Sequence, residues 1–351
     1  MADISDQLQQ QVQTAHAGRT PLRIQGGNSK HFYGNPVEGE VLDISGHSGI
    51  VSHEPTELVL TARAGTPLDE IEATLAQSGQ MLSFEPPHFN GGATIGGAIA
   101  AGLGGPRRPW GGAPRDLVLG VKLLDGQGQV LSFGGQVMKN VAGYDVSRLM
   151  AGSFGALGAI LEVSLKVLPA PAKTRTLVLD MNRDDAVRAM REFSRKPLPL
   201  TAACFLDGHL YLRLAGSHAS VNAWKQRIGG EETAEHNTFW QRLRDHQLDY
   251  FQREQTLWRL SLAGKAPRLA CEEHSLLDWA GAQRWVYTSA SATEIREEVA
   301  AQGGHAQAFR HAAGIDAFQP MEPLLLSLHQ RLKQRFDPHA IFNRQRLFQH
   351  D

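Results

Sequence analysis

Cysteine is scarce in this sequence, and its scarcity excludes several kinds of site. The 351 residues include only two cysteines, Cys204 and Cys271. Two thiols cannot build a disulfide framework, a four-cysteine zinc site or an iron–sulfur cluster. Any iron–sulfur centre that serves this chain must therefore belong to another protein.

An excess of charge and a long apolar run are missing as well. The 35 Lys and Arg residues balance 36 Asp and Glu residues, which gives a formal net charge of −1. This balance provides no general attraction to nucleic acid or to an anionic membrane. The uncharged run over residues 93–106, mostly Gly and Ala, is too short to span a bilayer, and the first residues resemble no signal or transit peptide. We expect a cytoplasmic protein, for which any association with a membrane would have to come through partner subunits.

Two common nucleotide-binding motifs are absent. The sequence contains no G-x-G-x-x-G and no G-x-x-x-x-G-K-[ST]. It therefore has neither the Rossmann fingerprint nor a P-loop. A dinucleotide site, if the chain has one, must be of another kind.

Glycine and proline divide the chain. Most of the 36 glycines fall between Gly26 and Gly158, and the paired prolines at 169–171 are typical of a linker. We expect a first domain over residues 1–170, a second domain over 171–320 and a C-terminal helix and segment over 321–351.

Hydrophobic periodicity predicts α+β structure in both domains. In the first domain we expect a helix that includes Leu68, Ile71 and Leu75, and strands at 22–25, 41–44, 58–64, 117–124, 129–133 and 159–167, with a weaker strand at 49–51. In the second we expect a largely antiparallel sheet with strands at 176–179, 202–206, 210–214, 257–262, 285–287 and 305–309, and helices at 184–195, 220–227 and 293–301. A last helix is expected at 322–335.

Three glycine-rich turns are the candidate ligand-binding elements. Gly26-Gly27-Asn28-Ser29 follows a predicted strand, where paired glycines can turn backbone N–H groups toward an anion. Thr94 is a candidate N-cap for a helix of small residues, which either offers its N-terminus to a phosphate or packs closely on a sheet. Gly152, Gly155 and Gly158 form the third turn, which a tight corner would explain equally well.

The joint order of these motifs resembles one known family. The chain is similar to the FAD-binding domain of the vanillyl-alcohol oxidase and p-cresol methylhydroxylase superfamily. The resemblance is carried by three segments in this order: GGNSK, ATIGGAIAAGLGGPRRPWGGAPRDLVLG and MKNVAGYDVSRLMAGSFG. The resemblance covers roughly residues 20–170, and residues 335–343 resemble the short piece that returns to the flavin. Within the superfamily, the wording most resembles the E-subunit family of bacterial glycolate oxidases.

The resemblance implies a fold and a set of cofactor contacts. The fold is α+β, with a two-part FAD-binding domain and a smaller cap domain. The implied FAD contacts are Gly26, Gly27, Asn28, Ser29, Pro86, Pro87, Thr94, Ile95, Gly96, Gly97, Gly102, Gly112, Asp116, Gly155 and Ile160. Many relatives attach flavin covalently through a histidine where this chain has Asn28, so we expect non-covalent FAD, with His31 as the nearby alternative.

The resemblance also implies a function. It predicts an FAD subunit that oxidises glycolate, or another small 2-hydroxy acid, within a complex that includes a longer flavoprotein and an iron–sulfur subunit. The histidine-rich metal site of catalytic relatives is missing from the second domain, so we expect no metal. Lys139 and Arg310 are weak catalytic candidates. The alternatives are a free-standing FAD-linked oxidase of another hydroxy acid or alcohol, and a non-catalytic FAD-carrying partner subunit.

Overall fold

The chain forms two compact units in the computed structural model, which describes residues 2–89, 91–135, 145–310 and 314–347. The first unit comprises residues 1–104, 112–170 and 320–351, and the second comprises 105–111 and 171–319. The sequence interpretation placed 105–111 in the first domain. This segment belongs to the second unit because Trp110 packs against that unit's core and Trp279 Nε1 donates a hydrogen bond of 3.0 Å to the Gly105 carbonyl.

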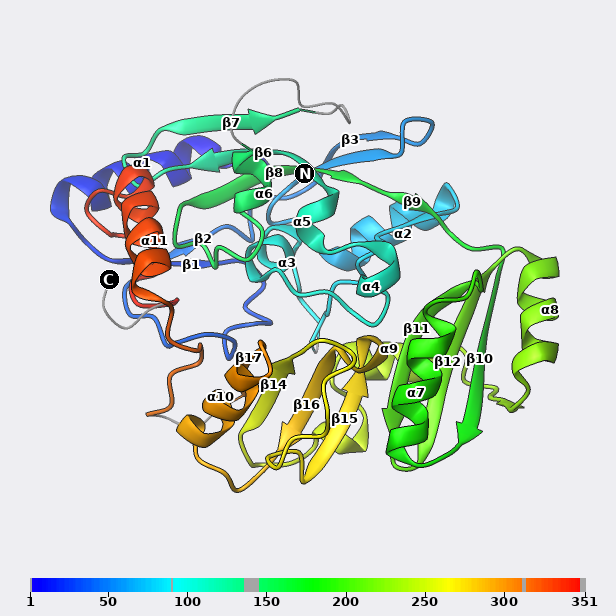
Figure 1. The fold of residues 1–351 in the computed structure, drawn as a ribbon. Helices are drawn as coiled ribbons and strands as arrows, with labels where there is room; N and C mark the ends of the chain where they lie inside the picture. The colour runs from blue at the N-terminus through cyan, green and yellow to red at the C-terminus, as the bar shows by residue number, and fades with distance from the viewer. Residues whose placement is uncertain (1, 90, 136–144, 311–313, 348–351) are drawn as a thin grey trace. The chain divides into compact units, whose positions relative to one another are not determined.

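An antiparallel sheet of five strands lies at the centre of the first unit (Figure 1). Its order is β3 (Ile50–Glu54), β4 (Val59–Arg63), β8 (Ala159–Lys166), β6 (Val118–Leu124) and β7 (Val130–Gly134). Two small pairs accompany it: the parallel strands β1 (Leu22–Gln25) and β2 (Glu40–Asp43), and the short β5 (Gln80–Met81) and β9 (Leu168–Pro169).

The helices of the first unit accompany these sheets. They are α1 (Ser5–Gly18), α2 (Leu68–Gln77), α3 (Ile95–Ala101), α5 (Pro114–Leu117), α6 (Val146–Leu149) and α11 (Pro323–Phe336). Leu68, Ile71 and Leu75 of α2 are fully buried, as their helical spacing predicts. The α11 helix ends at Asp337, before Pro338, and residues after it return to pair beside β1.

An eight-stranded antiparallel sheet forms the second unit (Figure 1). Its order is β13 (Glu231–Glu232), β10 (Lys173–Asp180), β12 (His209–Gly216), β11 (Leu200–Leu206), β15 (His274–Asp278), β16 (Gln283–Tyr287), β14 (Leu257–Ser261) and β17 (His305–Arg310). The hairpin turn at Asp207-Gly208 joins β11 to β12, between the predicted strands 202–206 and 210–214. The α+β class and the antiparallel character of this sheet are confirmed.

Helices pack on both faces of that sheet. The unit contains α4 (Arg108–Gly111), α7 (Arg183–Phe193), α8 (His218–Ile228), α9 (Thr238–Arg244) and α10 (Ala292–Ala301). The helices α7 and α8 bury Met190 and Val221 against leucines of β12. The helix α10 covers the β14 side chains Trp258 and Leu260. From the other face, Trp240 of α9 donates a hydrogen bond to the Thr176 hydroxyl.

No helix in the described ranges is both long enough and apolar enough to cross a membrane.

Candidate functional site

A cavity of about 340 Å³ opens in the first unit beside the first glycine-rich turn. The turn, α3, Phe154 and the C-terminal segment line it together. A second cavity of about 90 Å³ shares Ile24, Gly26 and Thr94 with the first. The lining residues come from four distant parts of the chain, which meet here because β1 pairs with the returning C-terminal segment. The larger cavity has the size typical of a site for a small molecule or part of a cofactor.

Backbone N–H groups of the first turn are available to a ligand in this cavity. Gly26, Gly27, Asn28 and Ser29 all line it, and their N–H groups find no acceptor among the residues that the structure describes. Asn28 has φ +56°, in the left-handed region. Successive N–H groups around such a residue form an anion-binding nest. The turn is therefore suited to a phosphate or diphosphate group.

The paired glycines are required by close packing around the turn. A Cβ atom on Gly27 would lie 1.4 Å from the carbonyl oxygen of Gly92, and one on Gly26 would lie 2.5 Å from Thr94 Oγ1. Both distances are far shorter than any real Cβ contact. The glycines thus allow the turn to pack against the residues that precede α3.

The helix α3 lines the larger cavity with one of its sides rather than with its N-terminus. The Thr94 hydroxyl caps it by accepting from Gly97 N, as the sequence predicts. The N–H groups of Ile95 and Gly96 donate to the carbonyls of Thr66 and Ala64, so the helix start has no N–H left for a phosphate. The close-packing alternative therefore holds for Gly96, whose Cβ would meet Ala64 at 2.5 Å. The other side of α3, which includes Gly97, faces the larger cavity.

Asn343 ties the C-terminal segment to β1 and to the third glycine-rich turn. Its Oδ1 accepts from Ile24 N at 2.9 Å, and its Nδ2 donates to the Phe154 carbonyl at 2.6 Å. Gly155 has φ +72°, and a Cβ there would lie 2.8 Å from Asn343 Nδ2. The third glycine-rich turn is thus a tight corner that also lines the smaller cavity.

The larger cavity is electropositive. Arg23, Lys30 and Arg346 line it, and no carboxylate does so within the described part of the chain. Arg346 donates to the carbonyls of Lys30, His31 and Asn35. Burial, followed by the charge of Arg23, lowers the pKa of Arg346 to about 10, which leaves it charged at neutral pH. Three cations beside a nest of N–H groups fit a diphosphate.

Comparison with known proteins identifies the cofactor of this chain. A family model described as an FAD binding domain matches residues 2–134. The glycolate oxidase subunit GlcE of Escherichia coli (strain K12) is 48% identical over 346 residues, which are 99% of this chain and 98% of that protein. This chain belongs to the same family of FAD-binding subunits. Its cofactor is FAD, and it is an FAD-dependent oxidoreductase of the p-cresol methylhydroxylase type.

More distant relatives share part of the chain. The glycolate oxidase subunit GlcD of Bacillus subtilis (strain 168) is 31% identical over 58% of this chain and 44% of its own length. A D-lactate dehydrogenase of Anaerostipes hadrus is 28% identical over 48% of this chain and 35% of its own length. The solved alkyldihydroxyacetonephosphate synthase has a TM-score of 0.68 at 14% identity, covering 96% of this chain and 75% of that one, and supports the fold alone.

The structure brings together more than half of the residues predicted to contact FAD. Those that line one or both cavities are Gly26, Gly27, Asn28, Ser29, Thr94, Gly96, Gly97, Gly155 and Ile160. Those outside the two cavities are Pro86, Pro87, Ile95, Gly102, Gly112 and Asp116. Among these, Ile95 is fully buried in the core, Gly102 caps the end of α3, and Asp116 accepts from Ala113 N. Contact of all fifteen residues with FAD stays a prediction.

The two weak catalytic candidates have different positions. Arg310 is the last residue of β17, and burial lowers the pKa of its guanidinium. Lys139 lies outside the described residues. His31, the alternative point of flavin attachment, lines the larger cavity, and its Nδ1 lies 3.0 Å from the Asn28 carbonyl. A ring nitrogen facing a carbonyl oxygen must carry the proton.

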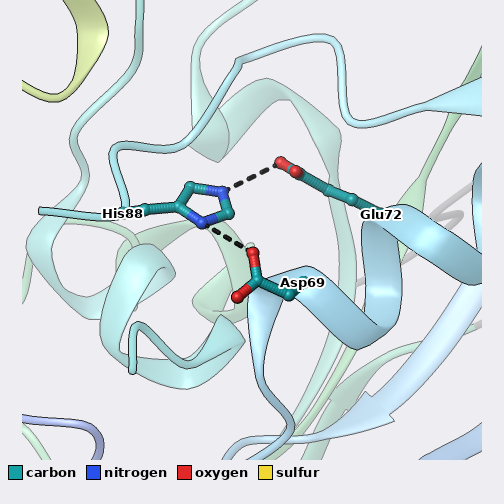
Figure 2. A group of neighbouring side chains, drawn as sticks. All are labelled: Asp69, Glu72 and His88. Atoms are coloured by element: carbon teal, nitrogen blue, oxygen red, sulfur yellow. Dashed lines mark hydrogen bonds and ion pairs between the residues drawn. The ribbon is translucent and has the colours of Figure 1, made fainter. Parts of the chain in front are cut away.

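One group of side chains in the described ranges has the composition of a metal site. Asp69, Glu72 and His88 offer ligand atoms within 4.8 Å of one another. Figure 2 shows the His88 ring between the two carboxylates, with Nδ1 3.1 Å from Asp69 and Nε2 3.2 Å from Glu72. Because the two carboxylates engage opposite nitrogens of one ring, this arrangement is a hydrogen-bonded ion pair that links the 86–88 segment to α2.

Sequence reasoning missed part of the cavity wall. Arg23, Phe154 and Arg346 line the site without having been singled out. The C-terminal segment was predicted to return to the flavin as far as Asn343. Arg346 lies three residues later, and extending the same segment would have found it.

Proposed function

We propose that this chain is the FAD-carrying subunit of a glycolate oxidase complex, which oxidises glycolate to glyoxylate and passes the electrons to an iron–sulfur subunit. The strongest support is the electropositive cavity with unsatisfied N–H groups at Gly26–Ser29, in a chain that matches a glycolate oxidase subunit along almost its whole length. The glycolate specificity and the membership of a complex are inferred from that relative's name, and the iron–sulfur partner from the family resemblance.

The residues of the cavity would hold the cofactor rather than react. The N–H groups of Gly26–Ser29 would bind the diphosphate, and Arg23, Lys30 and Arg346 would neutralise it. Bound FAD supplies an acceptor for the two electrons that leave the alcohol carbon. Oxidation of glycolate to glyoxylate also releases two protons, one from that carbon and one from the hydroxyl. Lys139 and Arg310 stay the candidates for stabilising charge in this step.

Onward electron transfer must go either to another subunit or to a soluble acceptor, because this chain cannot hold an iron–sulfur cluster. Cys204 and Cys271 are both buried free thiols, and burial raises the pKa of each. Two such thiols cannot hold a cluster, which needs four ligands. We therefore propose an iron–sulfur subunit and a longer flavoprotein subunit as partners; the cytoplasmic location likewise stays a prediction.

We propose that FAD is held without a covalent bond. Asn28 has no nucleophilic nitrogen, and His31 uses Nδ1 toward the Asn28 carbonyl. Acid precipitation of the purified chain is expected to release all the flavin into the supernatant. Flavin that stays with the pellet, and is lost from it in His31→Ala, would contradict non-covalent binding.

A second candidate function is a non-catalytic FAD carrier within the same complex. This candidate is favoured by the second unit's lack of a metal site: among its described residues, no group of His, Cys, Asp and Glu has the geometry to hold a metal ion. Anaerobic addition of glycolate to the purified FAD-loaded chain separates the two. Bleaching of the flavin absorption supports its own substrate turnover. Unchanged absorption, with bleaching only in the assembled complex, supports the carrier.

A further inference from the structure

A row of polar side chains crosses the second unit's sheet on the face opposite α10. Trp258 and Leu260 of β14 point toward α10, so Arg259 between them points to the other face. Arg259 is paired with Gln307 of β17. Asp278 of β15 is paired with Gln283 of β16. These four side chains lie on one face of four neighbouring strands.

Hydrogen bonds join the row in series. Gln283 Nε2 donates to Asp278 Oδ2 at 3.1 Å. Arg259 Nε donates to Gln283 Oε1 at 2.7 Å, and Arg259 Nη1 donates to Gln307 Oε1 at 3.3 Å. Asp278 is buried and fixes the Gln283 amide with its oxygen toward Arg259. The guanidinium is therefore held in one orientation by neutral groups.

The charge of Arg259 has no counter-charge within the described part of the chain. Its partners there are the two glutamine oxygens and the ring of Trp279, whose centroid lies 5.2 Å from the guanidinium carbon. A guanidinium has five N–H donors, and the glutamines use two. The three that remain include N–H groups on both Nη1 and Nη2, the fork that binds a carboxylate through two parallel hydrogen bonds. Partial burial of a positive charge costs free energy unless a negatively charged group lies beside it, and a bound ligand would supply that group.

The aromatic neighbour of Arg259 is held by a strained turn. Trp279 and Ala280 have φ of +53° and +55°, a conformation that costs non-glycine residues about 1–3 kcal/mol each. Asp278 Oδ1 accepts from Trp279 N at 2.8 Å, and Arg108 also lies over the Trp279 ring, 4.5 Å from its centroid. Strain of this kind concentrates at ligand-binding sites. The turn keeps the indole beside the guanidinium.

We propose that Arg259 binds the carboxylate of a small organic acid through its outer N–H fork. The identity of that acid as a 2-hydroxy acid rests on the proposed function; the carboxylate site itself does not. The planar fork donates two parallel hydrogen bonds to a carboxylate, and the single positive charge of Arg259 balances the single negative charge of a monocarboxylate. Gln283 and Gln307 are positioning residues that hold the fork.

The test measures carboxylate binding rather than turnover. Calorimetric titration of the full FAD-loaded chain with glycolate, oxalate and acetate gives the dissociation constants, and glycolamide serves as the uncharged analogue. Arg259→Gln is expected to weaken binding of the acids about 30-fold or more, without effect on glycolamide. Arg253→Gln, at an exposed arginine of the same unit, is the matched control and is expected to leave binding unchanged.

A second variant keeps the test independent of folding. Gln307→Glu places a carboxylate beside Arg259, so the variant should be at least as stable as the wild type and yet lose acid binding. Equal acid binding by wild type, Arg259→Gln and Gln307→Glu would overturn the proposal, and so would loss of FAD rather than acid in Arg259→Gln. Acid binding that depends on Arg259 but excludes glycolate would support this site and contradict the glycolate assignment.

Discussion

At the scale of single residues, the cavity beside the Gly26–Ser29 turn depends on positions where a side chain has no room. The Gly26–Ser29 turn can pack against Gly92 and Thr94 only because Gly26 and Gly27 carry no Cβ atom. The sequence predicted this turn well, since paired glycines after a strand are a local signal. It did not reveal Arg346, whose hydrogen bonds to Lys30 and His31 join residues more than 300 positions apart.

Gly27→Ala is expected to remove FAD binding. Its Cβ would lie 1.4 Å from the Gly92 carbonyl oxygen, so the turn must shift and misdirect at least two charge-assisted hydrogen bonds. At about 1.5–3 kcal/mol each, their loss corresponds to a dissociation constant raised about 100-fold or more. Flavin content and fluorescence titration measure it. Gly46→Ala is the control, because its Cβ meets only the flexible Ile4 tip at 3.3 Å. Equal FAD affinity in both variants would contradict the assignment.

At the scale of elements, α11 serves as the anchor of the returning C-terminal segment. Lys333 is buried and donates to the carbonyls of Ala156 and Phe342 and to Asp337, whose carboxylate also accepts from Ile341 N and Phe342 N. This network sets the position of Asn343. The helix was predicted from its sequence pattern, whereas the partners of Lys333 are defined only by the tertiary fold.

Lys333→Met is expected to destabilise the first unit and weaken FAD binding together. Removal of one partner from a buried charge pair costs about 3–5 kcal/mol, and Asn343 would lose its support. Thermal unfolding followed by flavin fluorescence reports both effects. Arg331→Met, at an exposed position of the same helix, is expected to change neither. A Lys333→Met protein with wild-type melting temperature and FAD content would rule out the anchoring role.

Elements without a strong local pattern escaped prediction. The helix α1 buries Leu8, Val12 and Ala15, a stripe too sparse among glutamines to predict a helix. The strand β15 begins with exposed His274 and ends with buried Asp278, so it lacks an apolar run. Its place in the sheet is decided by pairing with β16. Such pairing is a tertiary contact and leaves no signal in the sequence of β15 itself. Segment 105–111 joined the second unit for the same kind of reason.

At the scale of the whole molecule, buried histidines make stability depend on pH. Burial lowers the pKa of His47 in the first unit and holds that of His246 in the second well below 6.5. In the unfolded chain these histidines bind protons near pH 6.5, whereas in the native state they stay neutral at that pH. The native state therefore loses stability as the pH falls below about 6.5, and the loss ends only at the depressed native pKa.

His246→Phe is expected to flatten this dependence. His246 stacks on Phe251 with ring centroids 3.9 Å apart, so phenylalanine preserves the aromatic packing. Removal of one titrating group reduces the slope by up to about 1.4 kcal/mol per pH unit between pH 6.5 and 5. All six tryptophans belong to the second unit, so urea unfolding followed by tryptophan fluorescence measures that unit alone. An unchanged slope in the variant would show that other groups cause it.

The chain passes between its two units at residues 104–105, 111–112, 170–171 and 319–320. A single protease cut at any one of these junctions would leave both units covalently connected through the others. The same threading limits exchange of the second unit between proteins. Replacement of residues 171–319 as one insert would leave Trp110 packed against the core of an unrelated protein. The two units must therefore evolve together. Changes in residues 171–319 must remain compatible with residues 105–111, which belong to the second unit but lie within the sequence of the first.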